Sequence, residues 1–188
     1  MKVHNKCPAL FASPLVATLA LAAPPNFSVT SPDFGPDRPI PESHTFNEYG
    51  CTGQNRSPAL EWQGAPIATK SLAITMFDLD EHGSPSGWWH WVVYNLPAST
   101  LRLPENAGAV NGNQLPAGAV QGRTDMGQDG YHGPCPGKGE PAHRYQITVY
   151  ALSVNKLPVP AEASGAMVTW TAHDYTLAKA TLTARYKR

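Results

Sequence analysis

Alternating apolar and polar side chains recur in several short stretches of this 188-residue chain, and turns rich in glycine and proline separate them. Alternation with a period of two is typical of β-strands that bury one face. The clearest stretches span residues 70–80, 87–97, 143–153 and 177–188, and weaker ones lie at residues 27–31, 43–46 and 59–62. The pattern therefore predicts a protein built mainly of strands.

Three of the long strands carry a polar side chain where an apolar row ends. The rows are Leu72, Ile74, Met76 and Asp78; Trp88, His90, Val92, Tyr94 and Leu96; and His143, Tyr145, Ile147, Val149 and Ala151. Trp89 and Trp91 fall on the opposite face of their strand and are expected to be packing residues. If the three strands are antiparallel neighbours, their polar ends meet at one rim of the core. Such a rim forms a pocket that is apolar at depth and polar at its mouth.

One helix is predicted late in the chain, after Pro160. Ala163, Met167 and Trp170 fall at positions i, i+4 and i+7, which places them on one helical face. Residues 98–142 read as loop. Many short strands, long turns and one late helix favour a mainly β fold, an antiparallel β-sandwich with the helix packed on its edge. We expect a single domain over residues 24–188.

The N-terminal residues 1–22 resemble a secretory signal peptide. Two lysines precede a short apolar run, which ends in small residues with a small-x-small cleavage site at residues 20–22. The alternative is a buried N-terminal helix. The run is too short for a comfortable transmembrane helix, and no later segment is long and apolar enough to be one. We therefore expect a periplasmic or secreted protein.

Cysteine usage agrees with export. Removal of the signal peptide would remove Cys7 and leave Cys51 and Cys135, an even pair for which a disulfide is expected in an oxidising compartment. The alternative is two buried, inert thiols. Two cysteines alone cannot form a structural zinc site.

Charge excludes one broad class of partner. The chain has 14 basic and 14 acidic residues and no basic run, so it lacks the electrostatic basis for binding nucleic acid.

A turn-rich loop, residues 130–145, leads directly into His143. Its four glycines allow close approach of the backbone to a ligand, and its three prolines fix the shape. A disulfide at Cys135 would anchor this loop to the turn at Cys51. Anchoring reduces the entropy lost when the loop closes on a ligand.

Four segments together carry a family resemblance: "NRSPALEW", "KSLAITMFDLD", "GWWHWVVYNLP" and "GYHGPCPGKGEPAHRY". In this order and spacing they resemble the signature segments of the phosphatidylethanolamine-binding protein family, and within it the bacterial Raf-kinase-inhibitor-like branch. The resemblance covers nearly all of the chain after the signal peptide. It implies a Greek-key β-sandwich with a C-terminal helix and a small anion pocket.

The resemblance also implies which residues bind the ligand. They are Asp78, Trp88, His90, Gly133, Pro134, Pro136, His143 and Tyr145, with Asp80 as a further candidate. Leu79 and Gly137 stand where the family has prolines, which affects the entrance of the pocket rather than its centre. Imidazoles and a phenol can donate hydrogen bonds to phosphate oxygens. Asp78 can orient an imidazole or accept an ammonium group.

Three function classes remain open. The first is a non-catalytic binder of phosphorylated or zwitterionic headgroup ligands, including phospholipid headgroups, without a cofactor or a resident metal. The second is a protein-interaction inhibitor of a kinase or protease. The third is a hydrolase that uses Asp78, His90 and His143, which no nucleophile motif supports. His82, His132 and His173 are expected on loops or at the surface. The oligomeric state is left open, with a homodimer among the alternatives.

Overall fold

The computed structural model describes residues 26–188 with the exception of residues 82, 85, 111 and 113. The predicted signal peptide and Cys7 therefore lie outside the described residues. Among the described residues, no helix has the length and apolar character needed to cross a lipid bilayer.

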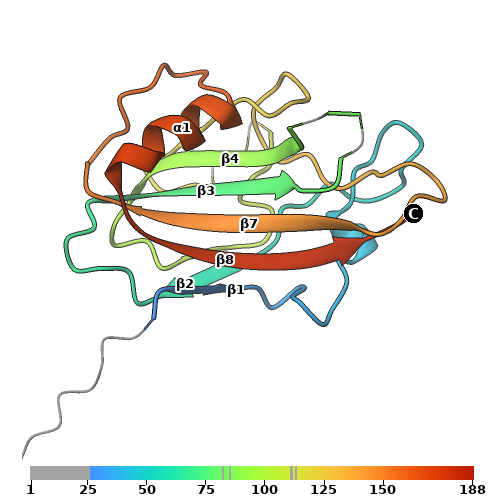
Figure 1. The fold of residues 1–188 in the computed structure, drawn as a ribbon, viewed down its shortest axis with the longest axis horizontal. Helices are drawn as coiled ribbons and strands as arrows, with labels where there is room; N and C mark the ends of the chain where they lie inside the picture. The colour runs from blue at the N-terminus through green and yellow to red at the C-terminus, as the bar shows by residue number, and fades with distance from the viewer. Residues whose placement is uncertain (1–25, 82, 85, 111, 113) are drawn as a thin grey trace, which may run out of the picture.

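Within the described residues, two antiparallel sheets and one α-helix form the fold, which confirms the predicted mainly β sandwich (Figure 1). The larger sheet has the order β6-β4-β3-β7-β8, with β6 (Val120–Gln121), β4 (Trp88–Pro97), β3 (Ser71–Asp78), β7 (His143–Leu152) and β8 (Thr176–Tyr186). The smaller sheet has the order β1-β2-β5, with β1 (Ser28–Thr30), β2 (Leu60–Gln63) and β5 (Arg102–Leu103). The helix α1 spans Gly165–Tyr175.

The strand predicted at residues 43–46 is wrong, because the chain turns there. Residues Glu42–His44 form a short 3-10 helix, η1. Both the backbone N–H and the hydroxyl of Thr45 donate to the carbonyl oxygen of Glu42. Threonine side chains commonly stabilise turns in this way and so compete with extended structure.

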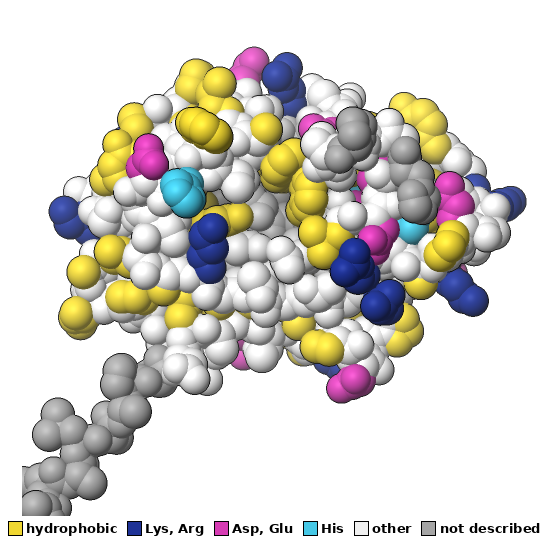
Figure 2. All heavy atoms as spheres, viewed as in Figure 1, with side chains coloured by type: hydrophobic (Ala, Val, Ile, Leu, Met, Phe, Trp, Pro, Cys, Tyr) yellow, Lys and Arg dark blue, Asp and Glu magenta, His cyan; other side chains and the backbone are white. Residues whose placement is uncertain are grey.

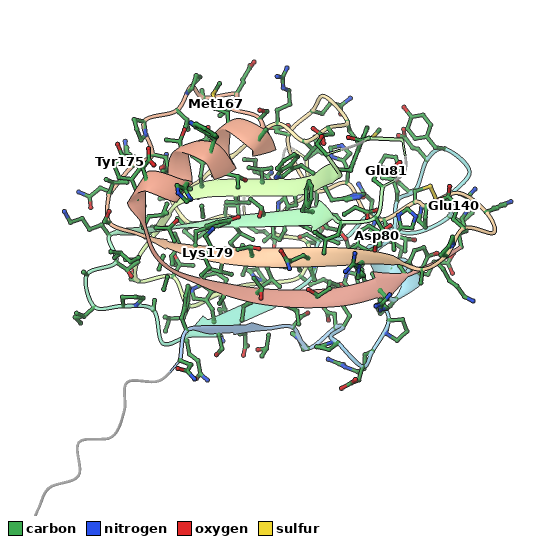
Figure 3. All side chains as sticks on the ribbon, viewed as in Figure 1. Asp80, Glu81, Glu140, Met167, Tyr175 and Lys179 are labelled. Carbon is green, nitrogen blue, oxygen red and sulfur yellow. A yellow bond between two sulfur atoms is a disulfide. The ribbon has the colours of Figure 1, made fainter. Side chains whose placement is uncertain are left out.

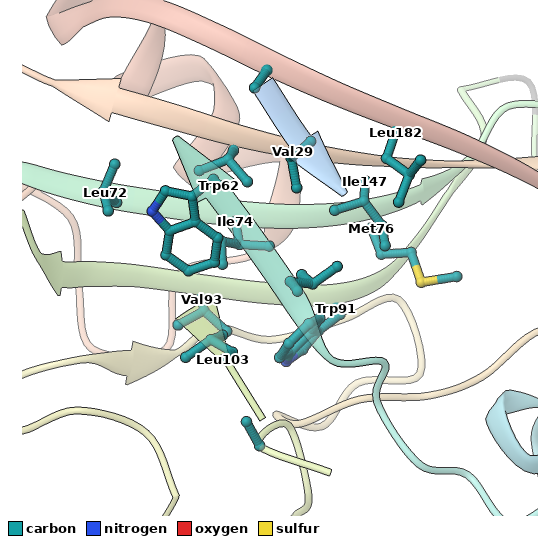
Figure 4. Close-up of a cluster of buried hydrophobic side chains, with 14 of the residues drawn as sticks. Val29, Trp62, Leu72, Ile74, Met76, Trp91, Val93, Leu103, Ile147 and Leu182 are labelled. Carbon is teal, nitrogen blue, oxygen red and sulfur yellow. The ribbon is translucent and has the colours of Figure 1, made fainter. Parts of the chain in front are cut away.

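The main core fills the space between the two sheets (Figure 4). Leu72, Ile74 and Met76 of β3 face Val29 and Trp62 of the smaller sheet, as the alternating pattern predicts. The inward rows of β7 and β8 continue the same core with Tyr145, Ile147, Val149, Ala151, Ala180, Leu182 and Ala184. Burial of this apolar surface is the main stabilising contribution to the fold.

The row predicted for β4 is wrong at two of its five members, Val92 and Tyr94. Met76 pairs with Trp91 and Phe77 with Trp89, so His90 is an extra residue in a β-bulge. Trp91 consequently faces the core between the sheets, although strict alternation places it on the face opposite His90.

The bulge also moves the residues that follow it. Val92 and Tyr94 turn to the outer face, where they pack beneath the helix. A second register shift, at Asn95 in a left-handed conformation (φ 58°), returns Leu96 to the inner core.

The apolar face predicted for the helix is also wrong. Gly165, Val168 and Ala172 are the buried residues of α1, whereas Met167 and Trp170 are 46% and 82% exposed. A Cβ atom built on Gly165 would lie 2.2 Å from the Trp89 ring, so only glycine permits this approach. The helix packs on the outer face of the larger sheet, against β4 and β7.

Candidate functional site

The register of the larger sheet brings the polar strand ends together. Asp78, the last residue of β3, pairs with Trp88 of β4 on one side and with Tyr145 of β7 on the other. His143 lies two residues before Tyr145, and the bulge at His90 lies two residues after Trp88. The predicted convergence of these groups is therefore present at one end of the sheet, on the right in Figure 1.

Asp78 and His143 form a buried pair behind this convergence. The Nδ1 atom of His143 lies 2.8 Å from Asp78 Oδ2, and both residues are 1% exposed. The other carboxylate oxygen of Asp78 accepts the backbone N–H of Asp80 at 2.8 Å. On its other side, His143 Nε2 lies 3.4 Å from Glu140 Oε2, and Figure 3 labels Glu140 at this end of the molecule. The carboxylate of Asp78 is thus fixed in position by its neighbours.

His90 is oriented by the backbone of the turn-rich loop. Its Nδ1 lies 2.6 Å from the carbonyl oxygen of His132, so the ring donates through Nδ1–H. In the neutral ring Nε2 is then an acceptor, and it becomes a donor only when the ring is protonated. Burial lowers the pKa of His90, which favours the neutral ring in the free protein. The His90 and Tyr145 rings pack in a T-shaped arrangement, with 5.3 Å between the ring centroids.

Tyr145 supplies a phenol that stays protonated. Burial, and secondarily the negative charge of Asp78, raises the pKa of Tyr145 far above its usual range. A protonated phenol keeps its O–H and can donate a hydrogen bond.

These groups surround a small hollow of about 80 Å³. It is lined by Phe46, Tyr49, Asp78, Glu81, Trp88, His90, Met126, His132, Gly133, Cys135, Pro136 and Tyr145. We call it the inner hollow. Six of the candidate binding residues are in this lining, and three others, Asp80, Pro134 and His143, are not. His143 supports Asp78 from behind instead of facing the space.

The glycine- and proline-rich segment forms one wall of the inner hollow. The Gly133 N–H donates to Asn55 Oδ1 at 2.8 Å, and the carbonyl oxygen of Pro134 accepts the Phe46 N–H at 3.0 Å. A Cβ atom on Gly133 would lie 2.3 Å from the carbonyl oxygen of His44, so the wall requires glycine here. Pro134 therefore holds the wall in place without lining the space.

The predicted disulfide between Cys51 and Cys135 is present and closes a sequence separation of 84 residues. Cys135 itself lines the inner hollow, so the bond ties the wall to the turn that precedes Cys51. The Arg188 guanidinium lies against the sulfurs, with Nη1 2.8 Å from Cys51 Sγ.

Asp80 is engaged elsewhere. Its carboxylate accepts three hydrogen bonds from Arg144, two from the guanidinium and one from the backbone N–H. The hydrogen bond from the Arg144 side chain lowers the pKa of Asp80 to about 2. This pairing joins the segment after β3 to the start of β7 and so holds the edge of the site.

Several lining residues were not predicted as site residues. His132 was expected on a loop or at the surface, but it is only 5% exposed, with its Nδ1 3.1 Å from the Thr124 hydroxyl. The sequence feature that could have identified His132 as a site residue is its position within the turn-rich loop of residues 130–145. Glu81 lies three residues after the end of β3, while Phe46 and Tyr49 gave no signal beyond their proximity to Cys51. His173 is exposed, as expected, and His82 lies outside the described residues.

The charges around the inner hollow are unusual for an anion site. Its lining has two carboxylates, Asp78 and Glu81, and two imidazoles, His90 and His132, but no lysine or arginine among the described residues. On the face in Figure 2, acidic and basic side chains are interspersed and form no broad basic field. The described lining residues therefore offer no fixed positive charge to an anion. The positive charge that attracts an anion would have to come from protonation of an imidazole.

The same end of the sheet offers ligand atoms for a cation. One atom from each of Asp78, Glu81 and His143 lies within 4.8 Å of the others. Carboxylate oxygens and imidazole nitrogen are ordinary metal ligands. In this structure Nδ1 of His143 is engaged by Asp78, so a cation bound through that atom would have to displace the hydrogen bond.

Comparison with known proteins places this chain and its fold in one family. The phosphatidylethanolamine-binding protein family model matches residues 30–187. The chain is 45% identical over 161 residues to the Escherichia coli UPF0098 protein YbcL, covering 86% of this chain and 87% of that protein. It is 46% identical over 147 residues to the E. coli UPF0098 protein YbhB, covering 78% and 91%.

Solved structures agree with the sequence comparisons. The crystal structure of E. coli YbcL, described as a new member of the mammalian PEBP family, superposes with a TM-score of 0.84 and 44% identity over 87% of this chain and 99% of that one. The Chlamydia trachomatis homologue CT736 gives a TM-score of 0.73 and 31% identity over 87% and 98% of the two chains. The chain belongs to the phosphatidylethanolamine-binding protein family, as its motifs predicted.

Proposed function

We propose that this protein is a non-catalytic binder of small phosphorylated or zwitterionic ligands, such as phosphate esters and phospholipid headgroups. The observation that carries the proposal is the inner hollow, in which His90, Tyr145 and a fixed carboxylate surround a space of about 80 Å³. This volume suits a group of a few heavy atoms, such as a phosphate, rather than a whole lipid.

Proton uptake would accompany the binding of an anion. His90 is buried, and burial lowers its pKa, which favours the neutral ring in the free protein. An anion in the inner hollow stabilises the imidazolium, so the pKa of His90 rises when the ligand binds. The affinity for an anion therefore falls as pH rises through the interval between the two pKa values.

The carboxylates favour a ligand that also carries a positive charge. Asp78 and Glu81 both line the inner hollow, and Figure 3 shows Glu81 just beyond β3. An ammonium group near them would offset the repulsion between the carboxylates and a phosphate. Phosphoethanolamine should accordingly bind more tightly than inorganic phosphate.

Two features support a non-catalytic role. The described residues that line the inner hollow include no serine or threonine, and their single cysteine is in a disulfide and so is not a nucleophile. We expect no turnover of 4-nitrophenyl phosphate.

The disulfide is compatible with an extracytoplasmic location, and we propose a periplasmic or secreted protein on this ground together with the N-terminal sequence.

The test is calorimetric titration with inorganic phosphate and with phosphoethanolamine between pH 5.5 and 8. Wild-type protein, His90→Gln and the control His173→Gln, at an exposed histidine on α1, would be compared. We expect affinity to fall as pH rises, by up to about tenfold per pH unit for one coupled proton. The control should retain this dependence and His90→Gln should lose most of it. Equal affinities of wild type and His90→Gln at every pH would overturn the proposal.

A further inference from the structure

A second hollow, of about 320 Å³, adjoins the inner one. It is lined by Phe46, Asn47, Glu48, Tyr49, Asn55, Val110, Met126, Gln128 and His132. We call it the outer hollow. Phe46, Tyr49, Met126 and His132 line both hollows, so the two spaces share a rim. A ligand bound in the inner hollow has this larger space directly beside it.

Tyr49 is the most unusual residue on the shared rim. Its side chain is 75% exposed, and its backbone is in the left-handed region at φ 53°. That conformation is uncommon and unfavourable for a residue with a large side chain. Holding this aromatic ring in water at the mouth of the site therefore lowers the stability of the fold. Strain of this kind clusters at ligand-binding positions.

The strained conformation is held from both sides of Tyr49. The Cys51 N–H donates to the carbonyl oxygen of Glu48 at 2.9 Å, and the Gly53 N–H donates to that of Phe46 at 2.9 Å. The disulfide then fixes Cys51 to the wall of the inner hollow. Tyr49 is thus positioned before any ligand arrives, which lowers the entropy cost of binding against it.

The geometry of the rim suits a flat ligand group. The Tyr49 and Phe46 rings are nearly parallel, with an interplanar angle of 15° and 6.0 Å between centroids. Aromatic rings prefer such offset stacking, and the exposure of Tyr49 leaves ring surface for a further planar group. Val110 and Met126 add apolar contact surface on the same hollow.

The polar groups of the outer hollow define the charge of that ligand group. Among the described lining residues there is no lysine or arginine, and Glu48 contributes a carboxylate, so a second anionic group would be repelled. The side-chain amides of Asn47 and Gln128 offer both donors and acceptors. A planar, uncharged group with polar edges matches this surface.

We propose that the outer hollow is a second compartment of the ligand site, which takes a planar, uncharged ring attached to the anion held in the inner hollow. The ligand class is then an organic phosphate that bears an aromatic or heteroaromatic group. This inference rests on the proposed anion-binding function, because the anion positions the ring beside Tyr49.

The test compares methyl, cyclohexyl and phenyl phosphate by calorimetry at pH 6. The three esters carry the same anionic group, and the last two differ mainly in the planarity of the ring. Stacking predicts that phenyl phosphate binds wild-type protein about 2- to 12-fold more tightly than cyclohexyl phosphate.

Tyr49→Gly removes the ring without straining the backbone, because glycine tolerates a positive φ. In this variant the preference for phenyl over cyclohexyl phosphate should fall to about one, whereas Tyr49→Phe should retain it. Trp170→Ala, which removes an exposed ring from the distant α1, is the matched control and should leave all three affinities unchanged.

The outcomes separate the two proposals. If methyl phosphate binds but phenyl and cyclohexyl phosphate bind equally, or if Tyr49→Gly keeps the preference, the second compartment is refuted and the anion site stands. If no ester binds wild-type protein, the proposed function fails and the further inference fails with it.

Discussion

The buried pair of Asp78 and His143 makes a quantitative prediction about the organisation of the site. Replacing Asp78 by alanine leaves two hydrogen-bond donors, His143 Nδ1–H and the Asp80 N–H, without their acceptor. The imidazole donor is fully buried and the backbone donor partly so. An unsatisfied buried donor costs about 1–3 kcal/mol, so Asp78→Ala should lower the free energy of unfolding by about 2–4 kcal/mol.

Asp78→Asn is the informative second variant. Its amide oxygen can still accept the Asp80 N–H, and its NH₂ group can donate to Nδ1 of His143 if the imidazole changes tautomer. The loss should therefore be smaller, about 1–2 kcal/mol. The expected order of stability is wild type, then Asp78→Asn, then Asp78→Ala.

Urea unfolding followed by tryptophan fluorescence measures these differences, with the disulfide kept intact. Asp37→Asn, at an exposed aspartate, serves as the control and should stay within about 0.5 kcal/mol of wild type. A stability of Asp78→Ala within that margin, or lower stability of Asp78→Asn than of Asp78→Ala, would refute the view that this carboxylate organises the site.

Three further predictions concern the framework around the site. Replacing both Cys51 and Cys135 by serine should lower the free energy of unfolding by at most about 4.5 kcal/mol, the chain-entropy value for a separation of 84 residues, as urea unfolding would show. Gly165→Ala should lower the melting temperature by a few degrees, because the added Cβ would clash with the Trp89 ring. Gly35→Ala is the control and should leave the melting temperature unchanged, because no atom lies within 4 Å of a Cβ built at that position. Burial lowers the pKa of His90 in the folded state, so the unfolded state binds more protons below about pH 6.5, and the free energy of unfolding should decrease as the pH is lowered there. In calorimetric scans at several pH values, His90→Gln should reduce this pH dependence of stability. An unchanged pH dependence in His90→Gln would refute the link to His90.

Much of the fold could be predicted from the alternating pattern, since β3 and most of β7 keep a period of two. The inward rows of β3 and β7 are as expected. The pattern failed in β4, because an inserted residue at His90 and the left-handed Asn95 each reverse the side chains that follow. Such bulges depend on pairing with the neighbouring strand, which a single sequence does not display.

The helix face failed for a related reason. Apolar size suggested Met167 and Trp170 as the buried positions, whereas close packing against the sheet selected a glycine and smaller side chains. Where a helix approaches a large ring such as Trp89, small residues are needed at the contact, and hydrophobicity alone does not identify them.

The centre of the site could be predicted because its groups end long strands that pair with one another. Asp78, Trp88 and Tyr145 are register neighbours, so the strand phases bring them together. The rim could not be predicted in this way. Phe46 and Tyr49 come from an irregular turn whose position depends on the disulfide and on hydrogen bonds to the wall, none of which has a periodic signature.

Nitrogen NMR of the histidine rings, during titration with inorganic phosphate at pH 6.5, tests most directly whether the inner hollow binds an anion through His90. When phosphate binds, the chemical shifts of the His90 ring nitrogens should move towards the values of the doubly protonated imidazolium. The ring of His44, which is held by the carbonyl oxygen of Arg56 and does not line the hollow, should stay unchanged. A His90 spectrum that is unaffected by excess phosphate, or equal shifts at both rings, would contradict anion binding through His90.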